Sequence, residues 1–149
     1  MKIKLIILLV LPLLLTGCLN DLFDKGDVEK TYDGPTVVGF FPLQREARLT
    51  NTTTTSVQVQ LIGEQRTSDL QVSYTVSGSS TAVAGTHYTI TSPSPVTIAA
   101  GTSTVNIGIN LIPGSLAAGQ SGVLILELQG GQGVEASANL ATARVIIRG

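Results

Sequence analysis

Five stretches in which every second residue is apolar constrain the fold of this chain more than any other feature of its sequence. Successive side chains of a β-strand point to opposite faces, so such a stretch buries one face and leaves the other in water. Turn-forming residues separate the stretches, and no segment keeps a helical period for three turns. The alternating stretches lie at residues 57–61, 70–76, 105–111, 124–128 and 143–147.

Three shorter strands are expected at residues 36–41, near 87–90 and at 95–98. Seven or eight short antiparallel strands over residues 36–149 predict an all-β domain, an immunoglobulin-like β-sandwich. A barrel is the alternative, and the neutral, Thr- and Gln-rich outer faces favour the sandwich. The chain has one cysteine and no tryptophan, so we expect a core of Val, Ile, Leu and Ala without an intrachain disulfide.

The first 17 residues have the organisation of a bacterial signal peptide. Lys2 and Lys4 precede an apolar run over residues 5–15 that only Pro12 interrupts. This run is shorter than the roughly 20 residues that a membrane-spanning helix needs. We therefore predict a signal peptide at residues 1–17, with an ordinary secretory leader or an uncleaved anchor as the alternatives.

The end of the apolar run reads Leu15-Thr16-Gly17-Cys18, which resembles the bacterial lipobox. Small residues at Thr16 and Gly17 let the signal peptidase approach, and the thiol of Cys18 accepts the lipid. The single cysteine of the chain stands at the one position where this motif requires it. We expect cleavage before Cys18 and a stable lipid anchor on that residue, since several acyl chains hold a protein on a bilayer where one chain is marginal.

Residues 18–35 follow as the lipidated cysteine and an acidic, flexible tether. Residues 19–33 carry five acids against two lysines. This stretch loosely resembles the surface-export signal of Bacteroidetes lipoproteins, and a solvated spacer is the alternative interpretation. The predicted location is therefore the bacterial cell envelope, at the outer membrane, with the surface and periplasmic faces both left open.

From residue 82 onward the chain resembles the Calx-β domain and related domains of unknown function in Bacteroidetes surface lipoproteins. The resemblance covers residues 36–149 and implies a β-sandwich used in adhesion, surface assembly or scaffolding. It rests on the order of five segments: Ala-Gly-Thr-His-Tyr at 84–88, Pro-Val-Thr-Ile-Ala-Ala-Gly at 95–101, the alternating stretch 103–111, Leu-x-Leu at 124–128, and the closing stretch 143–147.

Calcium-binding members of that family carry acids at one end of the sandwich, and this chain lacks them. The family pattern places Asp where this chain has His87, and further acids at 112–116 and 119–122, where none is found. Calcium requires about six to eight oxygen ligands with carboxylates among them. We therefore expect no high-affinity calcium site and no cofactor other than the lipid on Cys18.

Other candidate residues have simple structural interpretations. The lone His87 is expected to be a loop residue whose ring bonds to backbone beside a packed Tyr88. Glu127 is expected on a polar strand face, where Arg144 or Arg148 is a possible ion-pair partner. The apolar cluster at residues 40–43 is interpreted as a core strand, with a partner-binding edge as the alternative.

These observations favour a non-catalytic, lipid-anchored module for adhesion or protein assembly. A glycan-binding accessory to a polysaccharide-uptake system is the alternative, although few aromatic residues are available to stack on sugars. An enzyme is the least favoured class, because acids, histidine and thiols are scarce in the domain. A formal net charge of −1 gives no electrostatic reason to expect binding to nucleic acid.

Overall fold

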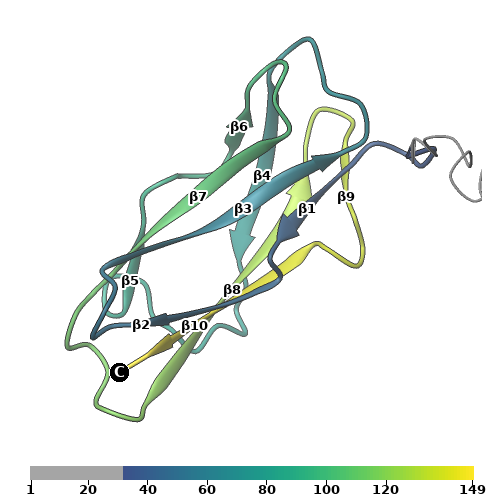
Figure 1. Cartoon of the computed structure of the whole chain (residues 1–149). Coiled ribbons are helices and arrows are strands. Elements are labelled where there is room, and N and C mark those ends of the chain that lie inside the picture. Colours follow the sequence, from purple (N-terminus) through teal and green to yellow (C-terminus); the bar gives the residue numbers. More distant parts are fainter. Residues whose placement is uncertain (1–31) are drawn as a thin grey trace, which may run out of the picture. The chain divides into compact units, whose positions relative to one another are not determined.

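The computed structural model describes residues 32–149, so the predicted signal peptide, Cys18 and most of the tether lie outside the described residues. Asp33–Gly149 forms one compact unit. Figure 1 shows its strands, which are β1 (Val37–Phe41), β2 (Gln44–Arg48), β3 (Thr54–Ile62), β4 (Leu70–Val76), β5 (Tyr88–Ile90), β6 (Val96–Ile98), β7 (Thr104–Leu111), β8 (Ser121–Gly130), β9 (Glu135–Ala136) and β10 (Thr142–Arg148).

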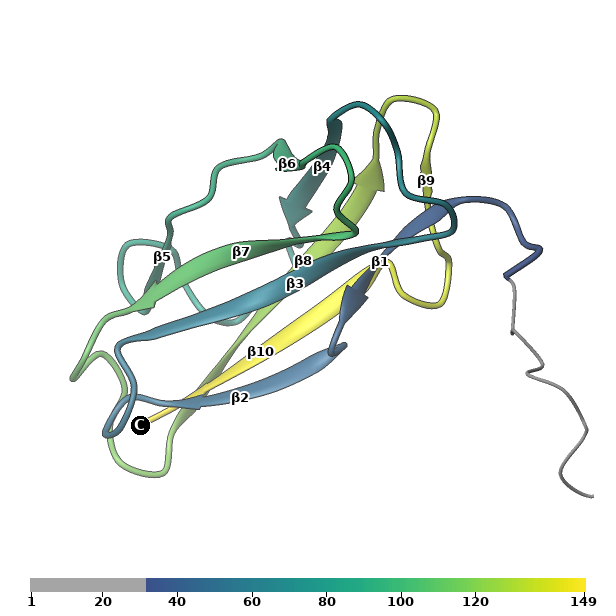
Figure 2. The same ribbon diagram turned by 45° about the horizontal axis from the view of Figure 1, so that its top comes forward.

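The strands form two five-stranded sheets that pack face to face. One sheet has the order β5-β7-β3-β1-β9 and the other has the order β2-β10-β8-β4-β6. Figure 2 shows β3 and β7 in one layer with β8 and β10 in the other. This arrangement confirms the predicted immunoglobulin-like β-sandwich. No helix in the described part of the chain is long and apolar enough to cross a membrane.

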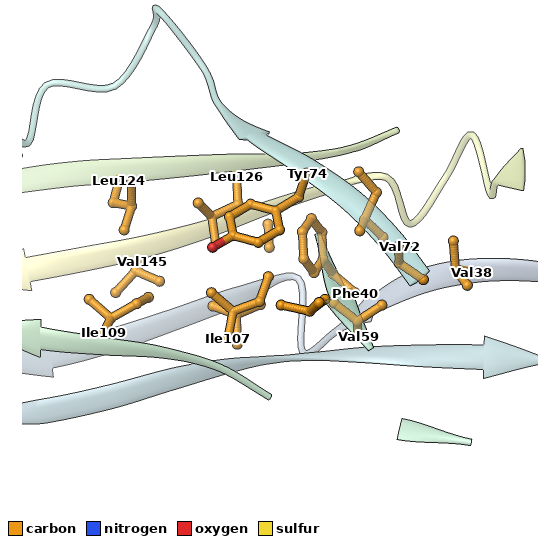
Figure 3. Packing of buried hydrophobic residues seen from close by; sticks show 14 of the residues in the cluster. Val38, Phe40, Val59, Val72, Tyr74, Ile107, Ile109, Leu124, Leu126 and Val145 are labelled. Atoms are coloured by element: carbon orange, nitrogen blue, oxygen red, sulfur yellow. The ribbon is translucent and has the colours of Figure 1, made fainter. Parts of the chain in front are cut away.

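Alternating burial explains why the chain forms these strands. In β8 the side chains of Leu124 and Leu126 are fully buried, while Ile125 between them is partly exposed. Each apolar side chain removed from water contributes about 1.5–3 kcal/mol, which rewards a strand that keeps its apolar residues in register on one face. Figure 3 shows the resulting core, where residues of one sheet point toward those of the other: Val59, Ile107 and Ile109 toward Leu124, Leu126 and Val145.

The chain changes sheets between β1 and β2. β1 pairs antiparallel with β3 until Phe41 lies opposite Gln58, and then Pro42 and Leu43 carry the chain across. β2 joins the other sheet, where it pairs in parallel with β10. Residues 54–57, the first half of β3, therefore pair with β7 on one side and have no neighbouring strand of the same sheet on the other.

Two short strands were not expected from the sequence, and both pair in parallel. β2 reads Gln-Arg-Glu-Ala-Arg, and only its Ala47 is buried, so it lacks an apolar alternation. β9 has two residues and pairs with Val37 and Val38 of β1. Strands this short or this polar are held by backbone pairing at the sheet edge, which leaves no periodic signal in the sequence.

The chain enters and leaves the sandwich at opposite ends. At the β9 end, Val37 pairs with Glu135, next to the last residues of β8. At the β5 end, the Gly149 amide donates to the Gln120 carbonyl at 3.0 Å, just before β8 begins. Since β8 runs from Ser121 to Gly130, its length separates the two places.

Candidate functional site

The β5 end brings together three segments that correspond to the calcium-binding positions of the Calx-β pattern. The amide of Ile112 donates to the carbonyl of His87 at 3.0 Å, which places the start of 112–116 beside the 83–87 loop. Residues 119–122 lie at the same end, because the amide of Ala82, next to that loop, donates to the carbonyl of Val123 at 3.0 Å. The sequence-based expectation that these segments share one end of the sandwich is therefore confirmed.

His87 holds its own loop closed. The Val83 amide donates to Nδ1 of His87 at 2.7 Å, and the Val83 carbonyl accepts the His87 amide at 2.8 Å. The imidazole thus accepts a backbone hydrogen bond through Nδ1, next to the buried Tyr88. This arrangement confirms the prediction that His87 is a loop residue bonded to backbone.

The polar groups at the β5 end stabilise turns. The Ser115 hydroxyl donates to the Ile112 carbonyl at 2.6 Å, and the Gln120 amide donates to the Ala117 carbonyl at 2.9 Å. Among residues 32–149, no three His, Cys, Asp or Glu side chains form a group that could hold a metal ion. The expected lack of a high-affinity calcium site stays a prediction, which a titration can test.

The ion pairs of the described residues differ from the one considered for Glu127. Glu46 of β2 accepts from Arg148 Nε at 2.8 Å and lies 3.3 Å from Arg48. The ion pair considered between Glu127 and Arg144 or Arg148 does not form, because the ion pairs among residues 32–149 join Glu46 to Arg48 and to Arg148. The true partner of Arg148 lies on β2, a strand that the sequence did not reveal.

A polar groove of about 690 Å³ opens where the chain has changed sheets. Arg45 extends from β2 across this groove, and its Nη1 donates to the backbone carbonyl of Ser56 in β3 at 2.8 Å. Serine, threonine, asparagine and arginine side chains dominate the lining, which consists of Arg45, Glu46, Ala47, Arg48, Asn51, Thr52, Thr54, Thr55 and Ser56. We call this feature the β2–β3 groove.

An exposed apolar surface adjoins the β2–β3 groove. Phe40 is buried in the core, whereas Phe41 is 62% exposed and Leu43 is 38% exposed. A smaller hollow of about 250 Å³ shares Arg45 and Ser56 with the groove, and its other lining residues are Phe41, Pro42, Gln58 and Asn106. The core interpretation of the cluster at 40–43 is therefore confirmed for Phe40, whereas Phe41 and Leu43 lie at the surface. The partner-binding alternative stays a prediction.

Sequence reasoning did not find the β2–β3 groove. Its walls come from strands of different sheets, and it exists because β1 stops at Phe41. The proline at position 42, directly after two phenylalanines, is the one signal that pointed to a break in the strand.

The fold and the placement of the loops at the β5 end define a Calx-β-like, immunoglobulin-type β-sandwich. No protein-family model and no curated protein sequence matches the chain. Solved structures do: the crystal structure of the apo form of the Calx CBD1 domain has a TM-score of 0.62 and 19% identity, and the match covers 77% of this chain and 97% of that one.

Two further solved structures show the same sandwich in other proteins. A protein of unknown function from Bacteroides ovatus has a TM-score of 0.56 and 18% identity over 74% of this chain, which spans 44% of that protein. The chaperone–tip adhesion subunit pre-assembly complex of Csu pili from Acinetobacter baumannii has a TM-score of 0.50 and 12% identity, covering 78% of this chain and 57% of that one. At these identities the comparisons establish the fold.

Proposed function

We propose that this chain is a lipid-anchored, non-catalytic module of the bacterial cell envelope that supports adhesion or protein assembly. The observation that carries the proposal is the order of its parts: a lipobox at Leu15–Cys18, an acidic stretch, and then a β-sandwich that begins at Val37. Such an order serves to hold a preformed surface near a membrane. A Bacteroides ovatus protein of unknown function and a pilus adhesion subunit complex with similar sandwiches support this class.

The described surface favours protein partners over glycans. Sugar sites use exposed aromatic rings for stacking. Among residues 32–149, Phe40, Tyr74 and Tyr88 are buried in the core, and the exposed aromatic side chains are Tyr32 and Phe41. A lone ring beside a strand edge is better suited to an apolar contact with a polypeptide than to a multi-sugar platform.

The anchor is tested by labelling cells that express the chain with an alkyne analogue of palmitate. We expect label on the wild-type chain and none on Cys18→Ala, which is expected to remain unprocessed or to be released. A matched Ser115→Ala variant, changed far from the lipobox in the sequence, controls for expression and keeps its label. Undiminished labelling of Cys18→Ala contradicts the proposal.

The role in assembly is tested separately by cross-linking at the surface of intact cells. The wild-type chain is expected to give discrete cross-linked protein bands that Cys18→Ala loses, because the released domain no longer stays beside its partners. Added protease distinguishes the two faces of the membrane, since a periplasm-facing domain survives the treatment. An array of glycans that binds the soluble domain strongly would instead favour the glycan-binding alternative.

A further inference from the structure

The first half of β3 presents unpaired backbone groups at the edge where β1 stops. In an antiparallel ladder, alternate residues direct both their N–H and C=O groups to the same neighbour. On the β7 side, the Thr53 carbonyl accepts a hydrogen bond from the Leu111 amide, and the Leu61 amide donates one to the Ser103 carbonyl. The backbone N–H and C=O groups of odd-numbered residues in β3 therefore point toward β7. Those of even-numbered residues point to the opposite side, where β1 pairs with Gln58.

Two even-numbered residues lie beyond the end of β1. The β1–β3 register ends with Phe41 opposite Gln58, so Ser56 and Thr54 direct their backbone groups into the β2–β3 groove. Of these groups, the Ser56 carbonyl accepts the hydrogen bond from Arg45. This bond already satisfies the Ser56 carbonyl, so a strand that pairs here must displace the Arg45 guanidinium from it.

The space beside this edge has the size and chemistry for an extended polypeptide segment. The groove of about 690 Å³ lies in the range of ordinary ligand sites. Arg45 and Arg48 line it with one acid, Glu46, whose carboxylate is shared between Arg48 and Arg148. The groove therefore favours acidic side chains, and the 62% exposed ring of Phe41 offers an apolar contact next to it.

We propose that the open edge of β3, together with Phe41 and Arg45, is a docking site for an extended, acidic and apolar segment of a partner protein. The segment adds as a strand in the line that β1 vacates, antiparallel to β3, and bonds to the backbone of Thr54 and Ser56. One carboxylate lies near the arginines and one apolar side chain contacts Phe41. This site rests on the proposed assembly function and names the surface through which it acts.

A second copy of the chain is a less suitable occupant. The neighbouring edge strand β2 carries charged or amide side chains at every position except Ala47. Charges on an edge strand oppose pairing between copies, which is how natural sheets avoid edge-to-edge aggregation.

The test uses residues 19–149, which include every residue of the hydrophobic core. The probe is a synthetic peptide of about eight residues, acetylated and amidated, in which valine alternates with threonine and glutamate. Binding is followed by fluorescence anisotropy and by the backbone amide signals of the labelled protein. We expect a Kd between about 0.1 and 1 mM, with the Thr54 and Ser56 amide signals shifted and protected from exchange.

Matched variants separate strand addition from other kinds of binding. Ser56→Pro removes the N–H that faces the groove and leaves the hydrogen bonds between β3 and β7 intact. It is therefore expected to weaken binding about tenfold. Ser56→Ala keeps the N–H and is expected to bind like the wild type. Phe41→Ser is also expected to weaken binding, whereas Val83→Ser, which changes an exposed apolar residue at the β5 end, does not.

Modified peptides keep the test valid if Ser56→Pro fails to fold. N-methylation along one edge of the peptide removes its donors and is expected to abolish binding, and replacement of glutamate by lysine is expected to weaken it about tenfold. Equal binding of all these peptides overturns the proposal. Absence of peptide binding also overturns it, while palmitate labelling of Cys18 reports on the proposed function independently.

Two further outcomes assign the edge to a different occupant and overturn the partner proposal. Dimerisation of the free protein that Ser56→Pro abolishes, measured by sedimentation, assigns the edge to a second copy. If residues 33–149 bind the peptide and residues 19–149 do not, the edge is assigned to the chain's own acidic stretch, residues 19–32.

Discussion

The Val83 amide and Nδ1 of His87 are joined by a 2.7 Å hydrogen bond that closes a loop of the chain upon itself. The acceptor is a side chain, so the bond depends on the residue at position 87. The family pattern has aspartate there, and a carboxylate also accepts a hydrogen bond from a backbone N–H. The same loop closure is thus available to both residues, whereas calcium binding requires the carboxylate.

Replacing His87 is expected to reveal this role in stability. His87→Ala leaves the Val83 amide without its acceptor and is expected to lower the free energy of unfolding by about 1 kcal/mol. His87→Asp restores an acceptor and is expected to lose less than half as much. Urea denaturation followed by circular dichroism measures both. Equal losses for the two variants would show that the hydrogen bond contributes nothing.

Calcium is expected to leave the stability of the wild-type domain unchanged. The segments 112–116 and 119–122 lie at the β5 end with His87 and contribute no carboxylate there. A ligand that binds the folded state raises its melting temperature, so calcium at millimolar concentration provides a direct assay. Magnesium at the same concentration is the control for ionic strength. A rise of several degrees with calcium alone would refute this prediction.

Gly39 is expected to tolerate no larger residue. A Cβ at this position would lie 2.7 Å from Cβ and 2.9 Å from Cδ1 of Leu140, which packs against β1. Gly39→Ala forces β1 or Leu140 to move and is expected to cost about 1–3 kcal/mol of unfolding free energy. Gly78→Ala is the matched control, since a Cβ added at Gly78 would meet nothing within 4 Å. Comparable denaturation midpoints for the two variants would contradict the crowding.

Alkaline pH is expected to destabilise the domain through two buried tyrosines. Burial raises the pKa of Tyr74 and of Tyr88 above the ordinary value. The unfolded chain therefore loses these protons at a lower pH than the folded domain does. The stability linked to these groups is fully present below about pH 10 and is lost as pH rises through the raised folded-state pKa.

The measurement is the melting temperature as a function of pH, together with tyrosinate absorbance. The Tyr74 hydroxyl donates to the Ser92 carbonyl, so Tyr74→Phe is expected to be less stable at neutral pH and to show a shallower decline above about pH 10. Tyr88→Phe is expected to show the shallower decline too. An unchanged decline in both variants would assign the alkaline sensitivity to other groups.

The sequence predicted those parts of the fold in which a strand buries one complete face. β3, β4, β7, β8 and β10 show this pattern, and their apolar residues form most of the core. β2 was missed because only Ala47 of its five residues is buried, so its place is determined by pairing with β10. The ion pair between Glu46 and Arg148 was missed with it.

The candidate docking edge could not be predicted for a related reason. Its existence depends on where β1 leaves one sheet and on which residues of β3 then face outward, and both follow from pairing register. A register can be shifted by one residue without changing the composition of a strand, yet the shift exchanges every bonded and unbonded backbone group. The β5 end was predictable because the positions of its loops follow directly from the order of the strands.

The separation between the places where the chain enters and leaves the sandwich has a mechanical consequence. β8 has ten residues, and at about 3.3 Å per residue it holds Val37 and Gly149 roughly 30 Å apart. A pull applied between those two points runs along hydrogen-bonded strands and loads many bonds together as shear. We therefore expect the domain to resist unfolding when it is pulled between these two points.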